Sequence, residues 1–233
     1  MSPARSSPAR VAIGPLLHES LGERVYRTVR DLILSQVFPP GSKLNVEQIC
    51  RDLGVSRTPV WDAMRRLESE GLVNTVARHG VFVLNYGADQ IRDLFAVRGT
   101  LEALAVRHAA LNLDDDARAG LEVSMKEMER SAGSGEMEQY SRAAIEFHDR
   151  VLAAARNRVL SRLLENVYAQ ILVLRLRSLY LPERVESSVA EHRALFEVVM
   201  GGEAERGERL ARAHADHVLQ DALEFTRRAE RDP

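Results

Sequence analysis

The stretch Val46–Val73, VEQICRDLGVSRTPVWDAMRRLESEGLV, predicts the fold of the N-terminal part of this 233-residue chain. Two short helices are expected in it, one over about 46–53 and one from Ser56 to about Glu70, because apolar residues recur at helical spacing. Gly54 is a common C-terminal cap for the first helix, and serine is a preferred N-cap for the second. Two short helices joined by the turn LGVS are typical of a helix-turn-helix.

A third helix is expected before this stretch, over 21–36. Its apolar residues follow helical spacing: Leu21, Val25, Val29, Leu32 and Ile33. The sequence Pro-Pro-Gly at 39–41 ends this helix, and residues 43–45 are expected to form a short extended link.

The hydrophobic period changes after the second helix of the pair. Residues 72–76 and 81–84 are two short runs rich in β-branched residues, which indicates strands. The residues between them form a hairpin turn, so a β-wing is expected. Arg78 and His79 lie at its tip, from which they can reach a DNA groove or a phosphate.

One face of the second helix carries side chains suited to DNA. This face holds Arg57, Thr58, Trp61, Asp62, Arg65 and Arg66, whereas Val60, Met64 and Leu67 face inward. An α-helix fits the major groove, where side chains near its N-terminus reach base edges and arginine can bond guanine with two hydrogen bonds. The alternative is a helix-turn-helix used only for protein contacts.

Charge and composition support this interpretation. Residues 1–87 carry 11 basic and 8 acidic side chains, whereas the remainder carries 21 and 26, so only the front half is suited to a polyanion. The single cysteine, Cys50, excludes an internal disulfide and favours a reducing, cytoplasmic setting. Residues 1–19 are expected to be a disordered tail, and no apolar run reaches the ~20 residues of a membrane-spanning helix.

The quoted stretch, followed by ARHGVFV, resembles the DNA-binding domain of GntR-family bacterial repressors, and the resemblance covers residues 20–85. The winged helix-turn-helix domain is expected to span residues 20–86. The resemblance implies DNA contacts from Arg57, Thr58, Arg65 and the wing around Gly80. The family usually has arginine where this chain has Trp61 and glutamate where it has Asp62. Trp61 cannot donate paired hydrogen bonds to guanine, although it can pack against a thymine methyl group or a sugar.

Residues 88–229 are expected to form a second, all-α domain, an antiparallel helical bundle. The expected helices are 89–111, 114–131, 136–155, 158–180, 184–200 and 203–228. The residues that separate them are breakers: Asn112, Gly133 with Gly135, Asn157, Pro182 and Gly201 with Gly202. The chain is thus predicted to be mainly α, and the bundle is long enough to enclose a ligand cavity.

Polar residues within apolar stripes are the informative positions of this bundle. Arg98, His148, His192 and His214 come from four different helices, and each lies on an apolar face. Three inward histidines can be hydrogen-bonded core residues, or they can bind Zn²⁺ or a similar divalent metal. Arg98 can pair with Glu102, four residues on, or it can bind the carboxylate of an effector.

Three segments, VRGTLEALAVRHAA, EFHDRVLAAARNRVL and EHRALFEVV, resemble the FCD ligand-binding domain of the FadR subfamily of GntR regulators, and His214 follows them. In metal-binding members an aspartate and three histidines hold the metal. The histidines match His148, His192 and His214, but the aspartate position is Ala144, so a weaker site is expected. Glu146 lies on the wrong face to replace the aspartate, and His217 is a possible fourth ligand that more readily faces solvent.

The resemblance also places Arg98 near an effector cavity. Arg175 is predicted to face inward as an effector or salt-bridge residue, and Tyr140 and Tyr168 are predicted to line the cavity or to pack in the core. The chain is therefore expected to be a homodimeric regulator, most simply a repressor, that leaves double-stranded operator DNA when a small carboxylic acid binds. The alternatives are a pure metal sensor, a zinc-dependent hydrolase and a nonspecific architectural DNA binder.

Overall fold

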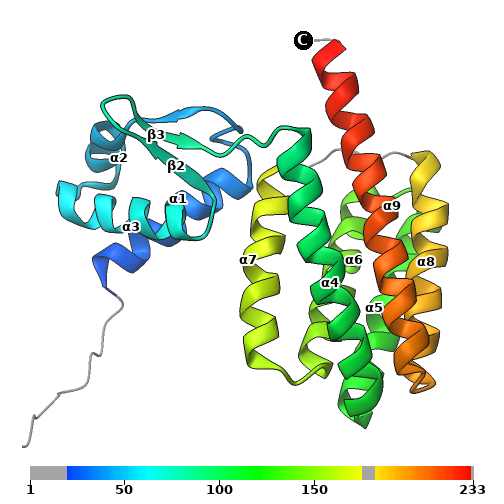
Figure 1. The fold of residues 1–233 in the computed structure, drawn as a ribbon. Coiled ribbons are helices and arrows are strands. Elements are labelled where there is room, and N and C mark those ends of the chain that lie inside the picture. Colours follow the sequence, from blue (N-terminus) through cyan, green and yellow to red (C-terminus); the bar gives the residue numbers. More distant parts are fainter. Residues whose placement is uncertain (1–19, 175–181, 232–233) are drawn as a thin grey trace, which may run out of the picture.

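The computed structural model describes residues 20–174 and 182–231, which form an N-terminal head and a helical bundle (Figure 1). The head contains α1 (Leu21–Leu34), β1 (Lys43–Leu44), α2 (Val46–Leu53), α3 (Arg57–Ser69), β2 (Val73–Val76) and β3 (Gly80–Val83). The bundle contains α4 (Ala88–Asn112), α5 (Asp115–Ser134), α6 (Met137–Ala154), α7 (Arg158–Leu174), α8 (Pro182–Met200) and α9 (Ala204–Arg231). The predicted fold class, a winged helix-turn-helix followed by an all-α bundle, is confirmed.

The turn between α2 and α3 follows the capping residues of the sequence. Gly54 adopts a left-handed conformation with φ of 64°, and its N–H donates to the carbonyls that end α2. The Asn45 side chain caps the start of α2 by accepting from the Gln48 amide at 3.1 Å. Ser56 occupies the N-cap position of α3 but makes no side-chain capping bond.

The wing has three strands rather than the predicted two. β2 and β3 pair as the expected antiparallel hairpin, and β1 pairs with the other side of β3, which gives the order β1-β3-β2. The predicted extended conformation of residues 43–45 is therefore confirmed for Lys43 and Leu44, but their pairing with β3 was not predicted. Two residues carry no periodicity, and a distant strand supplies their hydrogen bonds.

Most bundle helices lie within a few residues of their predicted ranges. α5 continues through Gly133, which the sequence predicts as a breaker, and ends at Ser134 with Gly135 as its C-cap, at φ of 73°. The helix predicted over 158–180 is described as far as Leu174, and its remaining residues lie outside the described part. None of the helices in the described ranges is both long enough and apolar enough to span a bilayer.

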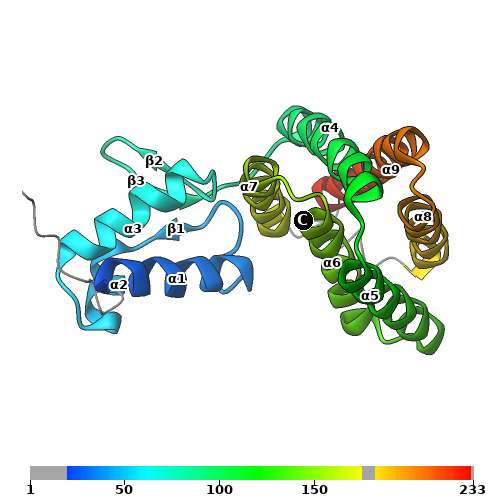
Figure 2. The ribbon, with the colours of Figure 1, turned by 90° about the horizontal axis from the view of Figure 1, so that it is seen from below.

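Each part of the chain has its own apolar core, and α7 joins the two. The head core contains Val29, Ile33, Val60, Met64 and Leu67, together with Ala169 from α7. Seen from below, α7 lies between the head and α4 and α6 (Figure 2). The bundle core surrounds Phe147, Leu164 and Leu195, all of which are almost fully buried.

Candidate metal centre and DNA-binding surface

Three histidines from three helices meet inside the bundle. His148 comes from α6, His192 from α8 and His214 from α9, and one ring nitrogen of each lies within 4.8 Å of the others. His192 and His214 are 3% exposed, and the His148 side chain is 17% exposed. The apolar stripes predicted around these positions therefore do face the same interior.

Hydrogen bonds fix which nitrogens face the centre. His192 donates from Nδ1 to the Ser188 carbonyl at 2.7 Å, and His214 donates from Nδ1 to the Glu191 carboxylate at 2.7 Å. The Nε2 atoms of both rings are then unprotonated when the rings are neutral. Carbonyl or carboxylate partners on the second nitrogen are typical of histidines that bind metals.

The spacing of the nitrogens suits a metal ion. The Nε2 atoms of His148 and His192 are 3.1 Å apart. Two nitrogens bound to one tetrahedral zinc, each at about 2.0–2.1 Å, lie about 3.3 Å apart. The donor set thus fits zinc or a similar divalent ion, with a coordination position left for a further ligand.

The protonation state also fits. Burial, reinforced by the neighbouring His214, holds the pKa of both His148 and His192 well below the ordinary value of 6.5. Both rings are therefore neutral near pH 7, as metal coordination requires. Burial raises the pKa of Glu191, but hydrogen bonds from His214 and Arg184 outweigh it and bring the pKa to about 2.

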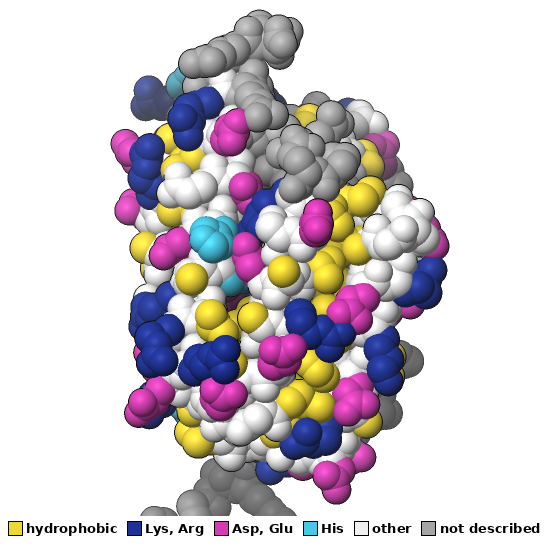
Figure 3. Space-filling view, turned by 90° about the vertical axis from the view of Figure 1, so that its right-hand side faces the viewer, with side chains coloured by type: hydrophobic (Ala, Val, Ile, Leu, Met, Phe, Trp, Pro, Cys, Tyr) yellow, Lys and Arg dark blue, Asp and Glu magenta, His cyan; other side chains and the backbone are white. Residues whose placement is uncertain are grey.

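The other acidic and imidazole candidates lie outside the histidine cluster. Glu146 is exposed and pairs with Arg150, as its predicted position on another face requires. His217 is 60% exposed and bonds the outer side of Glu191 at 2.9 Å. Ala144 supplies no donor atom. Figure 3 shows histidine among acidic and basic side chains on the face of the bundle formed by α8 and α9.

Arg98 pairs with the neighbour that the sequence offered as its alternative partner. Its Nε donates to Glu102 Oε1 at 2.9 Å, and both side chains are under 10% exposed. Tyr168 also donates to Glu102 Oε1, at 2.7 Å, and His148 Nδ1 lies 3.8 Å from the same oxygen. Glu102 Oε2 is buried and has no hydrogen-bond partner among the described residues.

The remaining predicted effector residues differ in their surroundings. Tyr140 is 3% exposed and packs in the bundle core. Tyr168 lies against the His148 ring, with centroids 6.1 Å apart. Arg175 lies outside the described residues. The structure thus brings Arg98, Tyr168 and the histidines into one neighbourhood, with Glu102 between them.

The predicted DNA-binding side chains of α3 are mostly solvent-exposed. Arg57 pairs with Glu47, and Arg65 pairs with Asp62. All four side chains in these two pairs are more than half exposed, so both arginines can exchange their partners for DNA at little cost. Thr58 and Trp61 are also exposed.

Arg66 differs from the other arginines of α3. Its guanidinium lies 3.6 Å from the centre of the Tyr26 ring and pairs with Glu23 and Glu70. These contacts hold it against α1, where it lines a cavity together with Thr58 and Asp62. Helical spacing predicts that Arg66 faces DNA, but it does not show that α1 packs beside this part of α3.

The wing places Arg78 and His79 in the exposed turn between β2 and β3, directly before Gly80. Arg78 adopts a left-handed φ of 65°. Lys43 of β1 is an exposed cation beside this turn that the sequence did not single out. Only the pairing of β1 with β3 brings it there.

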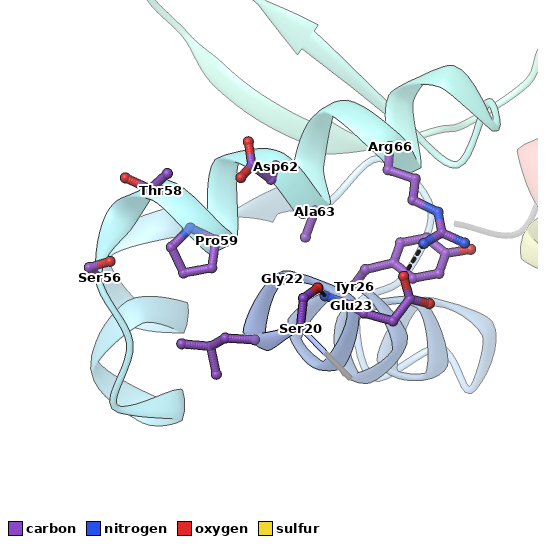
Figure 4. A pocket seen from close by; sticks show the side chains of 11 residues that line it. Ser20, Gly22, Glu23, Tyr26, Ser56, Thr58, Pro59, Asp62, Ala63 and Arg66 are labelled. Carbon is purple, nitrogen blue, oxygen red and sulfur yellow. Dashed lines mark hydrogen bonds and ion pairs between the residues drawn. The ribbon is translucent and has the colours of Figure 1, made fainter. Parts of the chain in front are cut away.

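A cavity of about 470 Å³ opens between the N-terminal ends of α1 and α3 (Figure 4). Its lining includes Ser20, Glu23, Thr58, Asp62 and Arg66. It lies in the head, apart from the histidine cluster. Because Thr58 lines this cavity, the cavity lies at the end of α3 that is expected to approach DNA.

Comparisons with known proteins match both parts of the chain. The gntR family of bacterial regulatory proteins matches residues 21–83, and the FCD domain matches residues 93–217. The chain is 31% identical over 193 residues to the uncharacterized HTH-type transcriptional regulator YdhC of Bacillus subtilis, which covers 82% of this chain and 86% of the relative. It is 26% identical to a probable D-xylose utilization operon transcriptional repressor of Paenarthrobacter nicotinovorans, over 86% of this chain and 92% of the relative.

The fold agrees with solved structures. Escherichia coli McbR/YncC superposes with a TM-score of 0.73 at 20% identity, over 89% of this chain and 99% of that one. A GntR regulator from Rhodococcus sp. RHA1 gives a TM-score of 0.70 at 21% identity, over 87% and 97%. With its exposed helix-turn-helix, its wing and its FCD domain, the chain belongs to the GntR family of bacterial DNA-binding transcription regulators.

Proposed function

We propose that this regulator releases or binds its operator according to the ligand state of the histidine cluster. In this proposal His148, His192 and His214 hold a divalent metal, and a small carboxylic acid completes the site. The regulator acts as a homodimeric repressor on an inverted-repeat operator. The observation that carries the proposal is the convergence of three imidazoles, of which His192 and His214 donate from Nδ1 to fixed acceptors.

The donor set supports the metal part of this proposal. Two of the three Nδ1 atoms donate to strong acceptors, Ser188 O and Glu191, which orient Nε2 toward the centre. A bound divalent ion would supply positive charge that attracts an effector carboxylate. Three protein ligands leave room for that carboxylate in the coordination shell.

Arg98 is the candidate second contact for the effector. Glu102 currently neutralises it, and Glu102 retains a buried oxygen without a partner. A buried acceptor without a partner costs free energy, so a hydrogen bond donated to this oxygen by a ligand or a water would stabilise the site. A metal-bound acid close to Glu102 would therefore act on a group that also contacts His148 and Tyr168.

Two alternatives make different predictions. A pure metal sensor would change its operator affinity with zinc alone, in the absence of any organic acid. A zinc-dependent hydrolase does not agree with the comparisons, since the family and the relatives are transcription regulators.

The test is the melting temperature of the full chain against a panel of carboxylic acids, in zinc and in chelator. A compound that binds the folded state raises the melting temperature by mass action. We expect one acid to stabilise the chain in zinc but not in chelator, and not to stabilise a His192→Ala variant. Stabilisation by zinc alone, with no response to any acid, would favour the metal sensor.

A further inference from the structure

α7 contacts the head in two places, at α1 and at the C-terminal end of α3. Gln170 of α7 donates from Nε2 to the carbonyl of Glu70, the C-cap residue of α3, at 3.0 Å. Its Oε1 accepts from the hydroxyl of Tyr86 at 2.8 Å, and Tyr86 lies in the segment that connects the head to α4. One side chain thus ties the recognition helix, the connecting segment and the bundle together.

The packing around Gln170 is close. The next residue after Glu70 is Gly71, and a Cβ atom there would lie 2.7 Å from Gln170 Nε2. Gly71 also has φ of 72°, which strains other residue types. The Tyr86 hydroxyl lies 3.4 Å from the Gly71 carbonyl, and Ala169 is buried in the head core. Gln170 is therefore closely packed against the end of α3 and the connecting segment.

The opposite face of α7 contacts the histidine cluster. Tyr168 precedes Gln170 by two residues, which places the two side chains on nearly opposite sides of the helix. Its hydroxyl donates to Glu102 Oε1 at 2.7 Å, and its ring lies against His148. Val167 and Ile171 anchor the same turns of α7 against α4 and α9.

We infer that Gln170 is a positioning residue for DNA recognition, and that α7 connects it to the histidine site. Its hydrogen bond to the Glu70 carbonyl sets where α3 lies relative to the bundle. A change in the partners of Glu102 moves Tyr168, and the rigid turn of α7 carries that movement to Gln170 and so to α3. The second step rests on the proposed metal and effector site, whereas the first does not.

Trp61 provides the readout, because it is the only tryptophan of the chain and lies on α3. Its fluorescence reports on the head, whereas far-UV circular dichroism is dominated by the bundle helices. Gln170→Met keeps the length of the side chain and removes both hydrogen bonds. Asn166→Ala, at an exposed position one turn earlier on α7, is the matched control.

The first experiment follows thermal unfolding of the full chain with both probes. We expect coincident midpoints in the unmodified chain and in Asn166→Ala. In Gln170→Met the Trp61 midpoint should fall several degrees below the circular dichroism midpoint, since the head loses the hydrogen bonds of Gln170 to Glu70 and Tyr86. Tyr86→Phe should separate the midpoints in the same direction. Coincident midpoints in both variants would overturn the inference.

The second experiment adds zinc and separates the inference from the proposed function. Zinc binding is measured by competition with a chromophoric chelator, and the Trp61 emission is recorded in parallel. We expect zinc to change the emission of the unmodified chain and to bind Gln170→Met equally well without changing its emission. An unchanged response in Gln170→Met would refute the link through α7. Failure of the unmodified chain to bind zinc would instead refute the proposed metal site, and the unfolding comparison would still decide the role of Gln170.

Discussion

Replacement of Arg98 by alanine tests the buried ion pair at the centre of the bundle. The Arg98 and Glu102 side chains are 7% and 4% exposed, and their hydrogen bond is 2.9 Å long. Removal of the arginine leaves a buried carboxylate whose only other described hydrogen bond comes from Tyr168. A buried charge that loses its partner costs roughly 3–5 kcal/mol of the free energy of unfolding.

The Tyr168 hydroxyl remains in place, so we expect a value near the lower end, about 3 kcal/mol. For a protein of this size that corresponds to a fall in melting temperature of roughly 6–12 °C. The double variant Arg98→Met with Glu102→Gln removes both charges and keeps an acceptor for Tyr168. It should recover most of the loss, because replacing both members of a buried pair is often nearly neutral.

Urea unfolding followed by circular dichroism, in chelator, gives both free energies. A loss below about 1 kcal/mol for Arg98→Ala, or a double variant no more stable than the single one, would refute the reasoning. The stability of Arg98→Ala also decides how its response to carboxylic acids is interpreted. A failure of Arg98→Ala to respond to an acid is informative only where the variant is still folded.

Three further predictions follow from other contacts. In chelator, stability should fall as the pH drops below about 6.5, because the lowered pKa values of His148 and His192 keep both rings neutral in the folded chain while the unfolded chain takes up protons. The free energy of unfolding should fall by about 1.4 kcal/mol for each of the two histidines between about pH 7.5 and 5.5, and urea midpoints that do not change over this range would contradict this. Arg57→Ala should reduce the discrimination between the right and the wrong base at one position of a duplex selected in vitro, by about 1–3 kcal/mol of binding free energy. An equal loss of affinity for all DNA sequences would instead indicate a nonspecific binder. Burial and the hydrogen bond to Glu70 raise the pKa of Tyr26 to about 12, so Tyr26→Phe should remove a late step from the tyrosinate absorbance titration. A loss of amplitude near pH 10 instead would show that Tyr26 ionises at its ordinary pKa.

The sequence predicted those features that depend on local signals. Gly54 and the apolar spacing on either side of it specify the helix-turn-helix, because capping and amphipathic packing act within a few residues. His148, His192 and His214 could be grouped because each interrupts an apolar stripe, and helical periodicity then places each of them inward. The family resemblance added which of the inward residues belong together.

The sequence could not show contacts between distant segments. Glu191 orients His214, yet it lies one residue before His192 and therefore off the stripe that singled out that histidine. Helical spacing places Arg66 on the predicted DNA-binding face, and only the packing of α1 against α3 brings Tyr26 and Glu23 beside it. Gln170 showed no signal either, because its role depends on the approach of α7 to the end of α3.

The most direct test of the proposed control is the dissociation constant for DNA at fixed salt, measured with the full chain and an in vitro selected duplex. The acid that stabilises the chain is added in zinc and in chelator. We predict that the acid weakens DNA binding by at least about 5-fold in zinc, the lower range of typical allosteric coupling, and has no effect in chelator or on His192→Ala. An unchanged dissociation constant, despite stabilisation by the acid, would contradict the claim that the histidine site controls DNA binding.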